Sequence, residues 1–203
     1  MISVLIVDDH PFLADGLRAA IDADPGMHVI GVAGTLAEAR VALAATLPTV
    51  TIVDVQLPDG SGFSLIDRAW TTRWLLLSSW GTPQYIGASL RVGASGYFLK
   101  TALPDRIIAA VRDIALGGVA FDPELTRDRS SSTDWHPLSP RERDVIRQLI
   151  KGRSNDEIGK DLGIARKTVE THLARLYERF DCASRSELVA RAEREGWLFL
   201  PHR

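Results

Sequence analysis

The residues of this chain best suited to chemistry stand where short apolar stretches end. They are three carboxylates, a hydroxyl and an ammonium group: Asp8, Asp9, Asp54, Ser78 and Lys100. If the apolar stretches are parallel strands, their carboxyl ends share one rim of a sheet, where open α/β sheets bind ligands. Carboxylates that lie close together repel one another unless a cation joins them, and oxygen ligands suit Mg²⁺. A lysine and a hydroxyl on the same rim can donate hydrogen bonds to a phosphoryl group.

This combination fits the transfer of a phosphoryl group to a carboxylate, and Asp54 is the candidate acceptor. It follows the apolar or β-branched run 50–53 and precedes a loop with Pro58, Gly60 and Gly62. An aspartate with its ordinary pKa of about 3.9 is ionised at neutral pH and needs no general base. A metal ion would screen it from the incoming anion. On this stretch alone, a role of Asp54 as the cap of a turn or helix explains its position equally well.

Only a parallel sheet would bring these residues together, and the pattern of residues 1–118 predicts one. Short apolar runs alternate with segments whose apolar residues recur at helical spacing. Such alternation indicates a parallel sheet covered by helices on both faces. The expected strands are 3–7, 28–33, 50–54, 74–77 and 95–99, and the expected helices are 11–21, 36–46, 63–70, 84–92 and 104–116.

Residues 1–118 resemble the receiver domain of response regulators. The motifs that carry the resemblance are Val7-Asp8-Asp9-His10-Pro11, Asp54 followed by Pro58, Ser78, and Gly96-Tyr97-Phe98-Leu99-Lys100. The resemblance implies a flavodoxin-like, doubly wound fold with a five-stranded parallel sheet. It also implies that a sensor histidine kinase transfers a phosphoryl group to Asp54. Mg²⁺ would be bound by Asp9, Asp54 and the Gln56 carbonyl, with Asp8 acting through water, and Ser78, Tyr97 and Lys100 would form the phosphoryl-binding switch.

Three positions depart from the pattern of that family or leave a choice. Ser78 stands where threonine is common, but it keeps the hydroxyl. His10 adjoins the acidic pair, and we interpret it as a loop residue rather than as a metal ligand. Trp80 lies in a loop that is often acidic in relatives, where it either shields the phosphoryl group from water or simply packs.

A second part of the chain follows a Ser-rich, charged stretch that we interpret as a linker at residues 119–137. Residues 138–203 contain two capping boxes, which begin at Ser139 and Ser154, and glycines where the first two helices end. The next helix, 166–180, carries several basic residues. Two short helices with a glycine turn indicate a helix-turn-helix. From spacing alone, a plain four-helix unit with a solvated basic face is an equally good interpretation.

Residues 138–203 also resemble the LuxR-type DNA-binding domain. The motifs are Leu138-Ser139-Pro140-Arg141-Glu142-Arg143, Ser154-Asn155-Asp156-Glu157-Ile158 and Lys167-Thr168-Val169-Glu170-Thr171-His172. The whole chain thus resembles a two-component response regulator of the NarL/FixJ type. By motif position, the residues that would face the DNA groove are Lys167, Thr168, Glu170, Thr171 and Arg175. Glu170 stands where many relatives have lysine; a carboxylate cannot neutralise phosphate, but it can accept a hydrogen bond from cytosine N4.

The implied function is that of a transcription factor, not an enzyme, in which phosphorylation shifts dimerisation and promoter binding. Its implied partners are a sensor histidine kinase, double-stranded DNA and a second copy of the chain. Two alternatives remain. An aspartate-nucleophile phosphatase needs a second acid two residues after the nucleophile, where this chain has Gln56. A receiver that is never phosphorylated would not need the full set of polar residues on the rim.

Composition supports a cytoplasmic protein. The chain has 203 residues, of which 45% are hydrophobic and 25% charged, and no apolar run approaches the length of a membrane span. The single cysteine, Cys182, excludes an internal disulfide and fits a reducing compartment. The formal net charge is −2, with the acidic excess in the front half and the basic excess in the back half, which favours the back half for contact with an anionic polymer.

Overall fold

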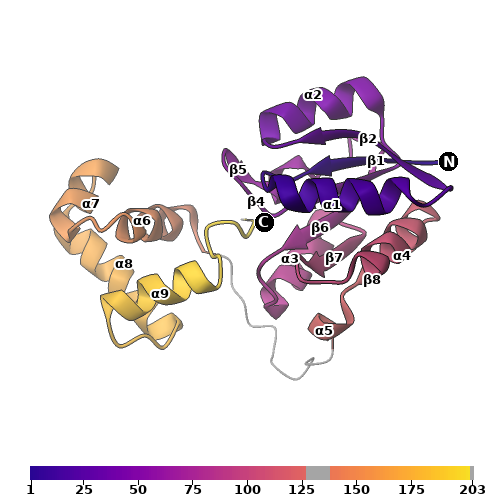
Figure 1. The fold of residues 1–203 in the computed structure, drawn as a ribbon. Helices are drawn as coiled ribbons and strands as arrows, with labels where there is room; N and C mark the ends of the chain where they lie inside the picture. The colour runs from indigo at the N-terminus through magenta and orange to yellow at the C-terminus, as the bar shows by residue number, and fades with distance from the viewer. Residues whose placement is uncertain (127–137, 202–203) are drawn as a thin grey trace. The chain divides into compact units, whose positions relative to one another are not determined.

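The structure is a computed structural model that describes residues 1–126 and 138–201, apart from the side chains of Pro83 and Thr126. The chain forms two compact units, an N-terminal α/β unit and a C-terminal helical unit (Figure 1). Most of the predicted linker, residues 127–137, lies outside the described residues, so the predicted domain boundaries stay a prediction. None of the described helices combines the length and apolar character needed to cross a membrane.

The N-terminal unit is built on a parallel sheet of six strands in the order β2-β1-β3-β6-β7-β8. The strands are β1 (Ile2–Val7), β2 (Met27–Ala33), β3 (Val50–Asp54), β6 (Arg73–Ser78), β7 (Gly96–Leu99) and β8 (Ala120–Phe121). The helices are α1 (Pro11–Asp22), α2 (Leu36–Thr46), α3 (Pro83–Val92) and α4 (Pro104–Ala115), and a short helix α5 (Pro123–Thr126) follows β8. The doubly wound fold predicted from the sequence is confirmed.

Helices cover both faces of this sheet. One face carries α1 and α4, whose buried residues join Val4, Ile52, Leu75 and Phe98 in one apolar core. Tyr97 points to the opposite face from its neighbour Phe98 because side chains alternate along a strand. There its ring lies 6.0 Å from the ring of Tyr85 in α3. The burial on both faces explains why β3 and β6 are nearly continuous apolar runs.

The sheet contains one strand more than the sequence predicts. Residues of β8 pair with β7, with Gly96 opposite Ala120 and Tyr97 opposite Phe121. A Cβ at Gly96 would lie 2.5 Å from the Ala120 carbonyl oxygen, so only glycine lets β8 approach this closely. The predicted five strands are all present, and the sixth occupies the start of the segment that we expected to be linker.

The helix predicted at 63–70 does not form. The chain makes a single 3-10 turn at Gly62–Leu65, and Ile66 is already extended with φ −72° and ψ 102°. The Asp67 carboxylate then accepts a hydrogen bond from the Ala69 backbone at 2.9 Å, a local turn that competes with helix. Phe63 and Leu65, two residues apart, are both buried. Both apolar side chains are thus buried within a single turn, without the longer helix.

The C-terminal unit consists of four helices: α6 (Pro140–Ile150), α7 (Asn155–Leu162), α8 (Arg166–Arg179) and α9 (Arg185–Arg194). Both predicted capping boxes are present, with Ser139 paired to Glu142 and Ser154 paired to Glu157. Trp197 is only 1% exposed, and its ring lies 3.9 Å from that of Phe180. Trp197 is therefore a core residue of this unit.

Helix α8 of this unit begins without a side-chain cap. Ala165 occupies the N-cap of α8 in an extended conformation and makes no capping hydrogen bond. We expect Ala165→Ser to stabilise this helix end by about 1 kcal/mol, because a hydroxyl there can accept from an unpaired backbone N–H. The matched variant Ser154→Ala removes an existing cap from α7 and should destabilise by a similar amount. Hydrogen exchange of the α7 and α8 amides in the full chain measures both; equal protection in Ala165→Ser and the parent would contradict the prediction.

Candidate functional site

The structure brings the predicted polar residues together on one rim of the N-terminal sheet. Asp8 follows β1, Asp54 ends β3 and Lys100 follows β7. Lys100 Nζ lies 2.7 Å from Asp54 Oδ2 and 2.9 Å from Asp8 Oδ2. Both carboxylates are buried, with Asp54 2% exposed, so one ammonium group faces two carboxylates where water screens little of their charge.

The carboxylate of Asp54 is held at both oxygens. Oδ1 accepts a hydrogen bond from the Gln56 backbone N–H at 3.1 Å, and Oδ2 accepts one from Lys100. Desolvation by burial raises the pKa of Asp54, while the contacts with Lys100 and with the Gln56 backbone oppose that rise. The ionised, nucleophilic form of Asp54 therefore depends on Lys100. Gln56 itself is exposed and opens the small hairpin of β4 (Gln56–Leu57) and β5 (Gly60–Ser61).

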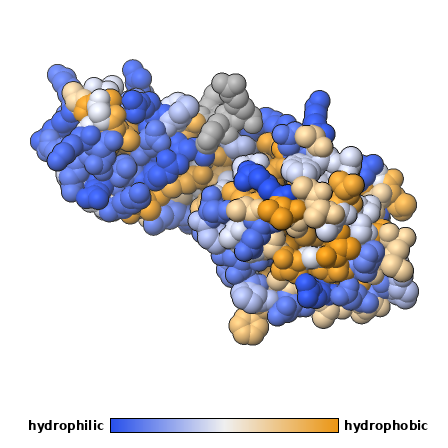
Figure 2. All heavy atoms as spheres, turned by 90° about the horizontal axis from the view of Figure 1, so that it is seen from above, coloured by the Kyte–Doolittle hydropathy of each residue, from blue (hydrophilic) through white to orange (hydrophobic). Residues whose placement is uncertain are grey.

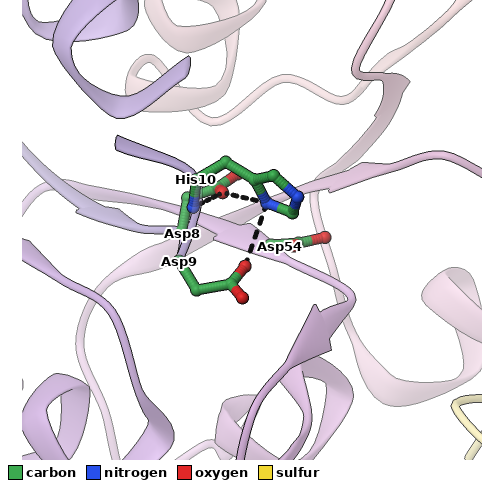
Figure 3. A group of neighbouring side chains, drawn as sticks. All are labelled: Asp8, Asp9, His10 and Asp54. Atoms are coloured by element: carbon green, nitrogen blue, oxygen red, sulfur yellow. Dashed lines mark hydrogen bonds and ion pairs between the residues drawn. The ribbon is translucent and has the colours of Figure 1, made fainter. Parts of the chain in front are cut away.

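Asp54 also belongs to an acidic group that could hold a metal ion. One ligand atom from each of Asp8, Asp9, His10 and Asp54 lies within 4.8 Å of the others (Figure 3). His10 Nδ1 lies 3.1 Å from Asp8 Oδ1 and 3.0 Å from Asp9 Oδ1. Asp8 Oδ2 is buried and accepts no well-aligned hydrogen bond among the described residues, but it is paired with Lys100 Nζ at 2.9 Å. Three carboxylates grouped in this way fit a hard divalent cation, which prefers oxygen ligands.

Ser78 and Tyr97 are linked through the backbone of Trp80. Ser78 Oγ accepts a hydrogen bond from Trp80 N at 3.0 Å, and the Tyr97 hydroxyl donates to the Trp80 carbonyl at 2.6 Å. Tyr97, a predicted residue of the phosphoryl-binding switch, is fully buried, and burial raises its pKa well above the ordinary value. The two hydroxyl groups could be predicted from the sequence, but the hydrogen bonds that join them through the Trp80 backbone could not.

The ring of Trp80 packs rather than standing free. It stacks on the ring of Tyr85, with a centroid distance of 5.6 Å and an interplanar angle of 11°. The Tyr85 ring in turn lies 6.1 Å from that of Phe63. This arrangement supports a packing role for Trp80, and its effect on the lifetime of a phosphoryl group stays a hypothesis. Tyr85 was not among the residues predicted from the sequence. The spacing of residues within a helix shows that Tyr85 can face the core, but not that its ring contacts the rings of Trp80 and Tyr97.

In the C-terminal unit, the candidate DNA-facing residues lie on the exposed side of α8. They are Lys167, Thr168, Glu170, Thr171 and Arg175. Val169 and Leu173, on the opposite side of this helix, are buried. Figure 2 shows the C-terminal unit as largely hydrophilic on the face it presents, whereas apolar residues gather on the face of the N-terminal unit. The structure also reveals that Arg166, which precedes this set, binds the carboxylate of Glu170.

Both units match known protein families. Residues 4–112 match the response regulator receiver domain, and residues 136–192 match the luxR family of bacterial regulatory proteins. The chain belongs to the two-component response regulators. This response regulator is similar to the transcriptional regulatory protein MctR of Rhizobium johnstonii, with 34% identity over 205 residues that cover 96% of this chain and 94% of MctR.

Two further relatives span the whole response regulator. The transcriptional regulatory protein UhpA of Escherichia coli is 33% identical over 200 residues, which cover 97% of this chain and 100% of UhpA. A crystal structure of ChrA, from a heme-sensing two-component system, is 27% identical and aligns with a TM-score of 0.53 over 97% of this chain and 98% of ChrA. Similarity thus extends through both units.

The family and the fold class predicted from the sequence are confirmed. This response regulator joins a receiver domain to a LuxR-type DNA-binding domain, and its relatives are transcriptional regulators. Its family consists of transcription regulators rather than enzymes. The roles of individual residues stay predictions, which the geometry above allows us to sharpen.

Proposed function

We propose that Asp54 is the phosphoacceptor of this response regulator and that a sensor histidine kinase is the donor. An oxygen of the Asp54 carboxylate forms the new bond to phosphorus, the bond from phosphorus to the kinase imidazole nitrogen breaks, and that nitrogen keeps the electron pair. The observation that carries the proposal is the 2.7 Å contact between Lys100 Nζ and the buried Asp54 carboxylate. The ammonium group neutralises Asp54 before transfer and can donate to the phosphoryl oxygens afterwards.

The acidic group fits Mg²⁺ as the cation of this site. Asp9, Asp54 and the Gln56 carbonyl would hold it, and Asp8 would act through water. The grouping of the three carboxylates supports this assignment, because one ligand atom from each of Asp8, Asp9 and Asp54 lies within 4.8 Å of the others. When bound, the cation supplies positive charge that offsets the phosphoryl oxygens. His10, whose ring nitrogen already contacts both acids, keeps the role of a loop residue.

Phosphorylation would act on the neighbouring hydroxyls and, through them, on the surface. The phosphoryl group adds roughly −1.5 to −2 charge and three strong acceptors next to Ser78 and Lys100. Donation from the Ser78 hydroxyl to this group would draw Ser78 towards it, and Ser78 is tied through Trp80 to Tyr97. We propose that this change shifts dimerisation, and that the dimer places two copies of α8 on two half-sites of double-stranded DNA in the cytoplasm.

The test is labelling of the full chain with acetyl phosphate and Mg²⁺, followed by intact mass and by selection of duplexes from a random DNA library. We expect one added phosphoryl group in the parent, none in Asp54→Asn, and enrichment of a two-half-site motif that is stronger after labelling. Asp54→Asn should keep the parent circular dichroism spectrum because the two side chains have the same shape. Full labelling of Asp54→Asn would exclude Asp54 as the acceptor.

A further inference from the structure

One carboxylate lies on the exposed side of the recognition helix, where contact with DNA would ordinarily favour positive charge. Glu170 Oε1 accepts a hydrogen bond from Arg166 Nε at 2.8 Å, one helical turn earlier in α8. Arg166 also reaches back to α7, because its Nη1 lies 3.2 Å from Asp156 Oδ2. The three residues form a chain of charges, Asp156–Arg166–Glu170, that fixes the position of the Glu170 carboxylate relative to both helices.

This chain of charges changes what Glu170 can do at DNA. A free carboxylate would be repelled by phosphate. Here one guanidinium lies between two acids, so the three residues together carry one negative charge rather than two, and the carboxylate can approach a polyanion at lower cost than it could without Arg166. Arg166 is held at Nε and Nη1 by the two acids. The exposed cations Lys167 and Arg175 remain for contact with phosphate.

The second carboxylate oxygen of Glu170, Oε2, remains available to accept a hydrogen bond. The Glu170 side chain is 47% exposed, and among the described residues Oε2 has no hydrogen-bond partner. The neighbouring Thr171 hydroxyl, by contrast, donates to the Lys167 carbonyl at 2.9 Å. An ionised carboxylate accepts hydrogen bonds and cannot donate them. The base that Glu170 could recognise must therefore present a donor to the major groove.

Only one base edge suits this requirement. Guanine presents two acceptors and thymine one acceptor and a methyl group. Adenine presents a donor at N6, but the adjacent N7 acceptor would repel a carboxylate. Cytosine presents the N4 donor without a neighbouring acceptor. We propose that Glu170 reads a cytosine in each half-site, with Arg166 and Asp156 as positioning residues; this proposal rests on the proposed DNA binding by α8.

The experiment is selection from a random duplex library by the full chain, labelled with acetyl phosphate and Mg²⁺. The parent should enrich cytosine at one position of each half-site. Glu170→Gln should shift that position to adenine, because an amide can bond both N6 and N7. The preference for the favoured base should be about tenfold, measured by competition between two duplexes that differ only there. Glu178→Gln, at an exposed position further along the same helix, is the matched control and should select the parent motif.

A positioning role for Asp156 has its own readout. Asp156→Asn should weaken the cytosine preference severalfold while leaving thermal stability and the salt dependence of binding close to the parent values. A motif from Glu170→Gln that equals the parent motif at every position would overturn the proposal and leave DNA binding by α8 intact. A parent that selects no motif at all would overturn both.

Discussion

Gly62→Ala should destroy the phosphoacceptor site and destabilise the receiver domain by about 3 kcal/mol, near the upper end of overpacking effects. A Cβ at Gly62 would lie 2.0 Å from the Asp54 carbonyl oxygen and 3.0 Å from Val53 Cγ2. The closest contact is with a backbone atom, which cannot move away by a change of rotamer as a side-chain atom can. Gly62 is also held in place, because its N–H donates to the Val55 carbonyl at 2.9 Å. The loop or the end of β3 must move.

Either movement should displace Asp54 from Lys100, so we expect Gly62→Ala to lose most acetyl phosphate labelling as well as stability. Urea unfolding and intact mass measure the two effects. The matched control is Gly16→Ala in α1, where a Cβ meets nothing within 4 Å. Because alanine favours helix, that variant should gain about 0.5–1 kcal/mol and label normally. A Gly62→Ala protein as stable and as readily labelled as the parent would contradict the close approach.

The features that could be predicted from the sequence are those that local chemistry determines. The ends of β1, β3 and β7 follow from apolar runs that stop at Asp8, Asp54 and Lys100, and parallel strands bring their carboxyl ends to one rim. The capping boxes at Ser139 and Ser154 follow from residues only three apart. In these cases the residues that decide the structure lie close together in the chain.

The features that the sequence did not reveal depend on contacts between distant segments. Two residues are too few to show the alternation of a strand, and β8 forms because Gly96 leaves room for Ala120. The apolar content of 63–70 predicts a helix, but the chain makes a single 3-10 turn in which Phe63 and Leu65 are both buried. The contact between Arg166 and Asp156 joins two helices, so no spacing within one helix predicts it.

Lys100→Met should destabilise the receiver domain by about 3 kcal/mol at neutral pH, because removing one partner of a buried ion pair leaves the other charge unpaired. Two buried carboxylates, Asp8 and Asp54, would lose the ammonium group that now lies within 2.9 Å of both. The Lys100 side chain is only 13% exposed, and methionine keeps most of its apolar stem, which isolates the effect of charge. Lys151→Met, at an exposed position, is the matched control and should change stability little.

The deficit of Lys100→Met should depend on pH and on Mg²⁺. Burial already raises the pKa of Asp54, and loss of Lys100 removes the contact that opposes this rise. When the folded state has the higher pKa, protonation favours folding, so the deficit is largest above the folded pKa and shrinks as pH falls towards about 4, the pKa of an unfolded aspartate. Excess Mg²⁺ should recover part of the lost stability by binding the folded state alone. Urea unfolding across pH, with and without Mg²⁺, measures both effects. A stability deficit that neither acid nor Mg²⁺ reduces would mean that Lys100 acts through packing rather than through its charge.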